Sequence, residues 1–255
     1  DSFRYPQLTH RINFEGFINI AEAVRLLDLE CFIFQASTSE IFGGSSPILR
    51  EDSKIFPRNP YAIAKTAAHL SVSSYRVNYG MSMSSGILFN HESELRGREF
   101  ITRKITFQLS EVKLGLRKVV KVGNLDASRD WGYAGDYVEA MRSIAEAKKS
   151  ADYVIATNKI HSIRALITLV GETLDMKIEF HVHQTGEVGI DTKTGKAVIE
   201  VAKEYVRKIE LPASQGDYTK IKNDLGWEPK TKFESFISAM VKSDYDSLKS
   251  KANSV

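Results

Sequence analysis

The sequence predicts an α/β fold built on a doubly wound parallel sheet, and three observations lead to that prediction. Short apolar runs of strand length alternate along the chain with stretches whose apolar residues recur at helical spacing. Strands separated by helices of this length form parallel βαβ units. A hairpin pattern and two further helices follow toward the C-terminus, and we expect them in a second, smaller lobe.

The first expected elements are a helix, a strand and a second helix. Residues 10–28 carry apolar side chains at close to a helical period. The run ECFIFQAS at 30–37 is nearly continuously apolar, which is typical of a strand covered on both faces. Pro60 suits the first position of a helix, and Gly80 suits the left-handed conformation that ends one.

The same alternation continues through the rest of the chain. We expect strands at 82–89, 118–124, 152–157 and 177–182, and helices at 100–115, 136–149 and 162–175. Residues 183–201 place a Thr-Gly turn between short alternating strands, which predicts a hairpin. Two helices are expected around Gly226, Trp227 and Pro229.

The composition argues against several classes of protein. A chain of 255 residues with 42% hydrophobic and 26% charged residues has an ordinary globular composition. Its net charge is +3, but the 35 basic residues are mixed with 32 acidic ones and form no stripe for nucleic acid. No apolar run approaches the ~18 residues that span a bilayer, and the polar start DSFRYPQLTH does not read as a signal peptide. Cys31 has no partner for a disulfide, which suits the cytoplasm.

A candidate catalytic pair lies at the start of the second helix. Tyr61 and Lys65 are four residues apart, so their side chains share one helix face. An ammonium near a tyrosine hydroxyl favours the phenolate, which can act as a general base. This spacing is common by chance, and an ordinary exposed helix is the alternative.

The preceding strand strengthens the catalytic interpretation. It ends in Ser37, Thr38, Ser39 and Glu40, and parallel sheets bind ligands beyond the carboxyl ends of their strands. Together the two segments supply hydroxyl, carboxylate, phenol and ammonium groups to one crevice, although a polar turn is the simpler reading of the first segment.

Several stretches resemble the extended short-chain dehydrogenase/reductase family, and within it the GDP-mannose 4,6-dehydratases. They cover nearly the whole chain in the right order: QASTSEIFG at 35–43, PRNPYAIAK at 57–65, GILFNHES at 86–93, FITRKI at 100–105, GNLDASRDWGYAGDYVEAM at 123–141, GEVGIDTKTGK at 186–196 and LGWEPK at 225–230.

The resemblance implies conversion of GDP-mannose to GDP-4-keto-6-deoxymannose and water, with transient hydride transfer to NADP. It makes Thr38 the hydroxyl that binds the sugar 4-OH and Tyr61 the base that takes its proton. Lys65 would tune Tyr61 and hold the nicotinamide ribose, and Glu40 would remove the C5 proton and assist loss of the 6-OH. Elimination needs this second acid/base, whereas simple redox chemistry does not.

The resemblance also implies binding residues. Tyr61, Lys65, His91 and Arg96 match cofactor-binding positions, and Asn90, Lys104, Arg129, Arg207 and Glu210 match positions around the nucleotide-sugar. Arginines suit a diphosphate because they donate two parallel hydrogen bonds. Each has a plainer alternative: Arg129 could cap a loop through Asp130, Arg207 could be solvated, and His91 could be a surface histidine.

The resemblance divides the chain into two parts. Residues 1–90 and 118–160 would form the remainder of a Rossmann-like NADP-binding domain. Residues 91–117 and 161–255 would form a substrate-binding lobe. The Gly-rich turn that holds the cofactor pyrophosphate does not occur in the sequence, and in the family it would precede residue 1. Glu94 and Leu95 stand where the family usually has Pro-Arg. A homodimer or homotetramer is implied.

Other functions stay open at this point. The chain could be a non-catalytic remnant that binds a nucleotide-sugar or a partner subunit, or a related nucleotide-sugar epimerase or reductase. His181 and His183 alternate on a strand, but with no third ligand in view we expect no metal site.

Overall fold

The structure is a computed structural model and describes residues 2–183, 186–205 and 212–252. The chain divides into two compact units, each assembled from three segments. The first unit comprises Asp1–His91, Asp130–Ile160 and Leu211–Lys230, and the second comprises Glu92–Arg129, His161–Glu210 and Thr231–Val255. Arg207 and Glu210 lie outside the described residues.

A parallel sheet forms the centre of the first unit. Its strands are β1 (Ile33–Thr38), β3 (Met83–Leu88) and β8 (Tyr153–Ile155), in the order β1-β3-β8. Every residue of β3 is buried, including the serines and the glycine of its sequence MSSGIL, as expected of a strand between two neighbours and covered on both faces. Thr38 lies opposite Leu88, so the carboxyl ends of β1 and β3 lie side by side.

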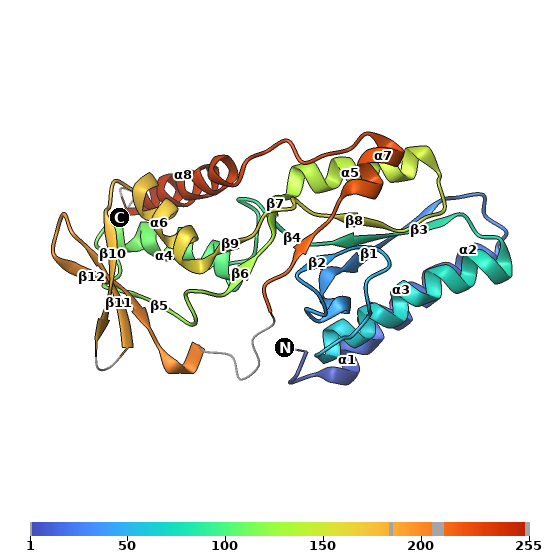
Figure 1. Ribbon diagram of the computed structural model, residues 1–255, viewed down its shortest axis with the longest axis horizontal. Helices are drawn as coiled ribbons and strands as arrows, with labels where there is room; N and C mark the ends of the chain where they lie inside the picture. The colour runs from blue at the N-terminus through green and yellow to red at the C-terminus, as the bar shows by residue number, and fades with distance from the viewer. Residues whose placement is uncertain (1, 184–185, 206–211, 253–255) are drawn as a thin grey trace. The chain divides into compact units, whose positions relative to one another are not determined.

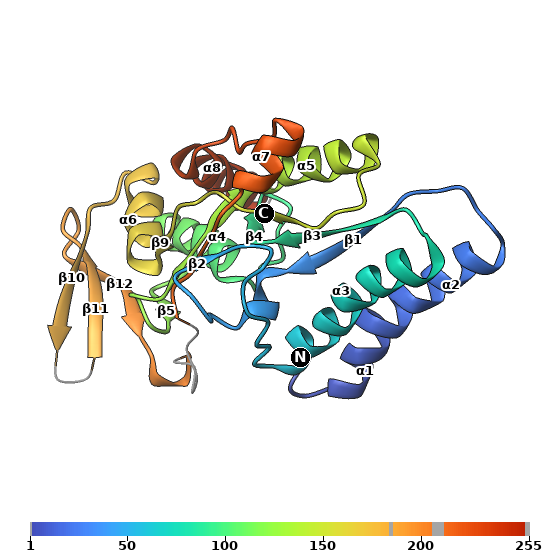
Figure 2. The ribbon, with the colours of Figure 1, turned by 45° about the vertical axis from the view of Figure 1, so that its right-hand side comes forward.

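Helices cover both faces of this sheet (Figures 1 and 2). On one face, α1 (Pro6–His10), a π-helical turn (Arg11–Glu15) and α2 (Gly16–Leu26) run continuously beside α3 (Pro60–Tyr79). Phe17, Ala68 and Met83 belong to the core between these helices and the sheet. On the other face, α5 (Ala134–Ala147) packs Tyr137 and Ile144 against β8. The alternating apolar runs therefore predicted the layers correctly.

The first helix begins earlier than expected. Pro6 occupies the first turn of α1, so helix starts before His10, where the apolar period first becomes visible. Proline is tolerated there because the first amides of a helix have no partner within it. α3 begins and ends as predicted, with Pro60 in its first turn and Gly80 left-handed at its end (φ 66°).

Short elements complete the first unit. A 3-10 turn (Ser39–Phe42) follows β1, β2 (Ile48–Leu49) pairs with β13 (Gln215–Gly216), and α7 (Thr219–Leu225) contacts β8. β4 (Asn90–Glu92) pairs with β7 (Trp131–Tyr133).

The second unit contains a four-stranded sheet in the order β10-β11-β12-β5. Its strands are β10 (Ile178–His183), β11 (Gly186–Asp191), β12 (Lys196–Val201) and β5 (Val120–Val122), and only the β12–β5 pairing is parallel. β11 and β12 form the predicted hairpin (Figure 2). The helices of this unit are α4 (Ile101–Lys113), α6 (Ile163–Thr173) and α8 (Phe233–Ala252). β6 (Ser128–Arg129) pairs with β9 (His161–Ser162), and a 3-10 turn covers Lys203–Tyr205.

The compact units differ from the expected division at His91, which lies in the first unit, and in two longer segments. Residues 118–129 lie in the second unit, because β5 pairs with β12 and β6 pairs with β9. Residues 211–230 lie in the first unit, because β13 pairs with β2 and α7 contacts β8. The assignment of cofactor binding to one unit and substrate binding to the other stays a prediction.

Candidate active site

Thr38 and Glu40 are held in a tight turn at the carboxyl end of β1. The Thr38 hydroxyl accepts a hydrogen bond from the Glu40 amide at 3.3 Å and so caps the 3-10 turn. The turn ends at Gly43, which has a φ of 56°. A Cβ on Gly43 would lie 2.0 Å from the Phe56 carbonyl oxygen, so only glycine fits the reversal.

The start of α3 lies next to this turn through a side-chain contact. Asn59 caps the helix: its Oδ1 accepts from the Ala62 amide at 2.8 Å. Its Nδ2 donates to Oε2 of Glu40 at 2.7 Å. The structure therefore brings Glu40 to the N-terminus of the helix that carries Tyr61 and Lys65, as expected for residues of one site.

Tyr61 and Lys65 are both partly buried on α3. Burial lowers the pKa of the Lys65 ammonium from its ordinary value. Among the described residues the ammonium has no hydrogen-bond or ion-pair partner. A partly buried lysine without a carboxylate is typical of a group that binds or tunes a ligand rather than one that stabilises the fold.

Three further residues complete the first unit's candidate groups, one on β1 and two on β4. Ser37 precedes Thr38 on β1, is 3% exposed, and its hydroxyl has no hydrogen-bond partner among the described residues. Asn90 and His91 lie on β4, and Nδ1 of His91 is 2.9 Å from the Phe89 carbonyl oxygen. The His91 ring lies 5.1 Å from the Tyr137 ring, so its position is fixed by packing.

The remaining described candidates lie in the second unit. Arg96 forms an ion pair with the buried Glu92 at 3.3 Å, and its guanidinium stacks on Phe100 at 3.5 Å. Arg129 donates to the carbonyl of Ser128 at 2.7 Å. The carboxylate of Asp130 accepts hydrogen bonds from Thr157 and Gly216.

Lys104 lines a cationic cavity of about 470 Å³ within the second unit. Burial, and after it the nearby Arg117, lowers the pKa of Lys104, whose ammonium lies 3.8 Å from the Tyr205 ring centre. The wall also contains Gln108, Leu116, Arg117, Lys118, Val119 and Lys121. The two carboxylates paired with these cations are Glu111, at 2.6 Å from Arg117, and Glu204, at 3.8 Å from Lys121.

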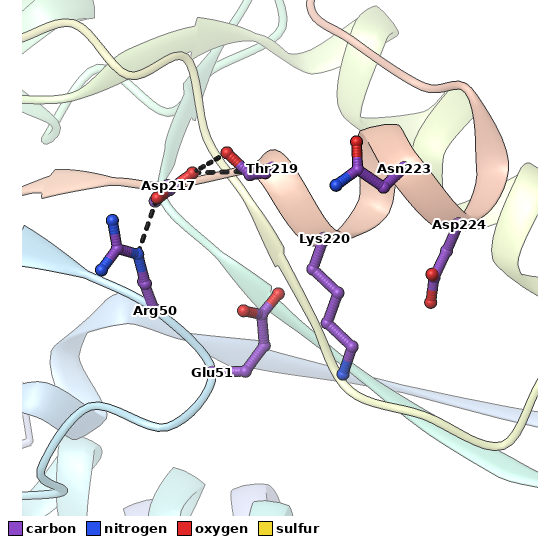
Figure 3. A pocket seen from close by; sticks show the side chains of 7 residues that line it. All are labelled: Arg50, Glu51, Asp217, Thr219, Lys220, Asn223 and Asp224. Carbon is purple, nitrogen blue, oxygen red and sulfur yellow. Dashed lines mark hydrogen bonds and ion pairs between the residues drawn. The ribbon is translucent and has the colours of Figure 1, made fainter.

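A second cavity, of about 510 Å³, lies in the first unit beside α7 (Figure 3). Arg50 and Asp217 form an ion pair across it at 2.7 Å, and Glu51 and Lys220 also line it. Glu40, Tyr61 and Lys65 do not line this cavity. The cavity is therefore separate from the candidate active site.

The described ranges contain neither a candidate metal site nor a candidate membrane span. No group of three or more His, Cys, Asp and Glu side chains could hold a metal ion there. No helix in those ranges is both long and apolar enough to cross a membrane.

Comparison with known proteins decides the family. The sequence model of the family described as GDP-mannose 4,6 dehydratase matches residues 1–240. The chain belongs to the GDP-mannose 4,6-dehydratase family.

Individual members of the family match almost the whole chain. It is 41% identical to the GDP-mannose 4,6-dehydratase of Sinorhizobium fredii (strain HH103) over 97% of this chain and 72% of the relative. It is 40% identical to GDP-mannose 4,6 dehydratase 1 of Arabidopsis thaliana, over 97% of this chain and 65% of the relative. For GDP-mannose 4,6-dehydratase sdnI of Sordaria araneosa the identity is 38%, over 98% of this chain and 46% of the relative. The chain thus spans between about half and about three quarters of these relatives.

Solved structures confirm the predicted α/β fold. The RMD protein of Pseudomonas aeruginosa, solved with NADPH, superimposes with a TM-score of 0.82 at 22% identity, over 96% of this chain and 77% of that chain. A dTDP-glucose 4,6-dehydratase (rfbB) of Bacillus anthracis, solved with NAD, gives 0.77 at 19% identity, over 94% and 70% of the two chains.

Asn59 and the cations near Lys104 have no role predicted from the sequence. Asn59 precedes Pro60 and was visible as a helix cap, but its contact with Glu40 joins two loops. The basic segment RKVVK at 117–121 is visible in the sequence, but only the fold shows that it lies beside Lys104 and Gln108 on α4.

Proposed function

We propose that the protein is a nucleotide-sugar 4,6-dehydratase that converts GDP-mannose to GDP-4-keto-6-deoxymannose and water. The observation that carries this proposal is the hydrogen bond from Asn59 to Glu40, which links the turn after β1 to the start of the helix that carries Tyr61 and Lys65. Membership of the GDP-mannose 4,6-dehydratase family supports the same reaction.

Tyr61 is the base for the sugar 4-OH. As a phenolate it takes the hydroxyl proton while hydride leaves C4, so that C4 becomes a ketone. The Lys65 ammonium favours the phenolate electrostatically, and no carboxylate among the described residues neutralises it. Thr38 holds the 4-OH from the end of β1.

Glu40 performs the elimination. The new ketone acidifies the C5 proton, which the carboxylate accepts and then gives to the hydroxyl that leaves C6 as water. A nicotinamide cofactor held at Lys65 would supply the acceptor for the C4 hydride and the donor for its return to C6. Solvent supplies a proton to C5 and receives one from Tyr61, so the protein ends each cycle unchanged.

The residues present fit the nicotinamide end of such a cofactor. Two hydrogen-bond donors at the end of the sheet, the Lys65 ammonium and the buried Ser37 hydroxyl, have no acceptor among the described residues. We propose NADP, with His91 and Arg96 among its contacts. The pairing of Arg96 with Glu92 reduces the charge it can offer a phosphate.

The cationic cavity of the second unit suits the nucleotide diphosphate. Lys104, Arg117, Lys118 and Lys121 outnumber the paired carboxylates, and Tyr205 adds an aromatic face. Charge-assisted donors bind diphosphates well. Asn90 and Arg129 complete the proposed set, with Arg207 and Glu210 outside the described residues.

A second copy of the chain is the proposed partner. Ile63, Leu70 and Val77 follow one another every seven residues along α3 and are 51%, 53% and 80% exposed. Because that spacing keeps them on one helix face, the same stripe on a twofold-related copy can pack against it. The cytoplasmic location expected from the sequence stays a prediction.

The test is mass spectrometry of GDP-mannose incubated with the purified protein, as the cell produces it, and NADP. We expect a product lighter by one water. Tyr61→Phe and Glu40→Gln should each lower kcat on the order of 10²-fold or more while the fold is kept.

An unchanged mass with an altered sugar would instead indicate an epimerase. No product, together with no saturable NADP binding by a folded sample, would leave only a binding protein. Normal turnover by Glu40→Gln would show that Glu40 is not the acid/base of the elimination.

A further inference from the structure

The side chain of Asn59 makes two hydrogen bonds with different consequences. Its Oδ1 accepts from the Ala62 amide at 2.8 Å, which any good helix cap provides. Its Nδ2 donates to Oε2 of Glu40 at 2.7 Å, and Glu40 lies 19 residues earlier in the chain. Helix capping explains the first contact and leaves the second unexplained.

Glu40 is otherwise held only through its backbone. Its amide donates to the Thr38 hydroxyl at 3.3 Å, and its carbonyl accepts from the Gly43 amide at 3.2 Å. Within the described part of the chain, Asn59 is the one side chain that binds its carboxylate, and it engages a single oxygen. Oε1 is left without a partner there and can face a ligand.

The backbone keeps Asn59 in this position. Its φ of −147° and ψ of 163° are extended, as required of a residue before proline, and Pro60 then starts α3. The side-chain amide is therefore fixed to the same helix end that carries Tyr61, two residues further along.

We propose that Asn59 is a positioning residue that orients the Glu40 carboxylate relative to Tyr61 and Lys65. This inference rests on the proposed dehydratase function. It assigns Asn59 to the elimination at C5 and C6, which Glu40 serves, and not to the oxidation at C4, which Tyr61 serves.

The Asn59 carboxamide can both accept from the Ala62 amide and donate to Glu40. Serine or aspartate at this position suits only the first of these contacts. Serine and aspartate both cap helices well. A serine hydroxyl sits on a shorter side chain and has a single proton to offer, and an aspartate would place a second carboxylate against Glu40. Asn59→Asp therefore keeps the cap and removes the donor, and Asn59→Ser keeps the cap and shortens the reach of the donor.

The experiment compares Asn59→Ser, Asn59→Asp and the parent, as the cell produces the protein, with GDP-mannose and NADP. We expect unchanged thermal midpoints and unchanged KM for Asn59→Ser, with kcat lowered on the order of tenfold or more. Because elimination slows and oxidation does not, the near-ultraviolet absorbance of reduced nicotinamide should rise in the steady state. Asn59→Asp should be slower still.

A cap-only role gives different results. Parental kcat in Asn59→Ser, or a lower kcat without accumulation of reduced nicotinamide, would overturn the proposal. Ser162 caps α6 by accepting from the Ala165 amide at 3.1 Å, so Ser162→Asp is a matched cap exchange that should change neither kcat nor the absorbance.

A readout without turnover separates this inference from the proposed function. The Asn59 side-chain amide protons should exchange slowly with solvent in the parent and faster in Glu40→Ala, by NMR. Equal exchange in the two proteins would overturn the inference. A protein that shows the exchange difference but yields no dehydrated sugar would contradict the proposed function alone.

Discussion

At the scale of single residues, several polar groups are buried without partners among the described residues. Besides Ser37 they include the Thr66 hydroxyl and Nδ1 of His69 on α3, and the Ser85 hydroxyl on β3. Each of these groups lowers the free energy of unfolding, because a buried donor or acceptor loses its hydrogen bonds to water without a replacement. Ser37 and Lys65 lie in the candidate active site, where a ligand could compensate.

His69 leads to a prediction on pH and stability. Burial lowers the pKa of its imidazole, while the charges facing it, Asp152 and Arg76, act on that pKa in opposite directions. The unfolded chain therefore takes up this proton at a higher pH than the folded chain. The stability contributed by neutral His69 is present above the unfolded pKa of about 6.5 and is lost as the pH falls toward the folded pKa.

We expect His69→Gln to lose less stability than the parent between about pH 7 and about pH 5, by up to about 1.4 kcal/mol per pH unit. Urea unfolding at several pH values measures this. Asp130 also titrates in this range, since burial raises its pKa to about 6, so only the difference between parent and variant is diagnostic. Parallel pH curves would contradict the prediction.

At the scale of elements, side chains protect the outer edge of the parallel sheet. β8 is the last strand, and its Val154 amide donates to Oε1 of Glu51 at 2.7 Å. The ammonium of Lys220 on α7 donates to the Asp152 carbonyl at 2.8 Å. Figure 3 shows both side chains in the wall of the first unit's cavity. They satisfy backbone groups that would otherwise pair with another strand.

The edge contacts give a prediction with a built-in control. Glu51→Ala leaves the Val154 amide without an acceptor and should lower the free energy of unfolding by about 1–3 kcal/mol. Glu51→Gln keeps an acceptor oxygen at this place and removes the negative charge of a carboxyl group whose pKa is raised by burial. Its free energy of unfolding should therefore stay within about 0.5 kcal/mol of the parent value. Urea unfolding measures both, and equal losses would show that the hydrogen bond is unimportant.

Asp130 has a related role between elements. It is 1% exposed and accepts from the Thr157 amide and hydroxyl at 2.9 and 2.6 Å, and from the Gly216 amide at 3.1 Å. The start of β7, the segment after β8 and strand β13 are joined through this one carboxylate. The RDWG motif thus contributes a structural residue next to Arg129.

At the scale of the whole molecule, the α3 stripe yields a prediction about assembly. Leu70→Glu places a charge in the middle of the stripe and should weaken self-association by on the order of tenfold or more. Sedimentation velocity at several concentrations measures it. Val138→Glu on α5 is the matched control, because Val138 is 57% exposed on the other side of the sheet. If both variants sediment like the parent, the stripe is not an interface.

The features that could be predicted from the sequence are those that depend on local periodicity. The pairing of Tyr61 with Lys65 depends only on helix spacing and could be predicted. The partner of β5 could not, because three residues, VKV, carry no information on which sheet they join. The contact between Asn59 and Glu40 depends on how two loops close over β1, and no repeat in the sequence encodes that.

The division of both units into separated segments has a consequence during synthesis. The first unit needs Leu211–Lys230, so the contact of Lys220 with the sheet edge forms only after most of the chain has left the ribosome. The second unit needs Thr231–Val255 and is finished later still. Neither unit can be released by one proteolytic cut, and a stalled ribosome would leave the Asp152 carbonyl, just before β8, open to other nascent chains.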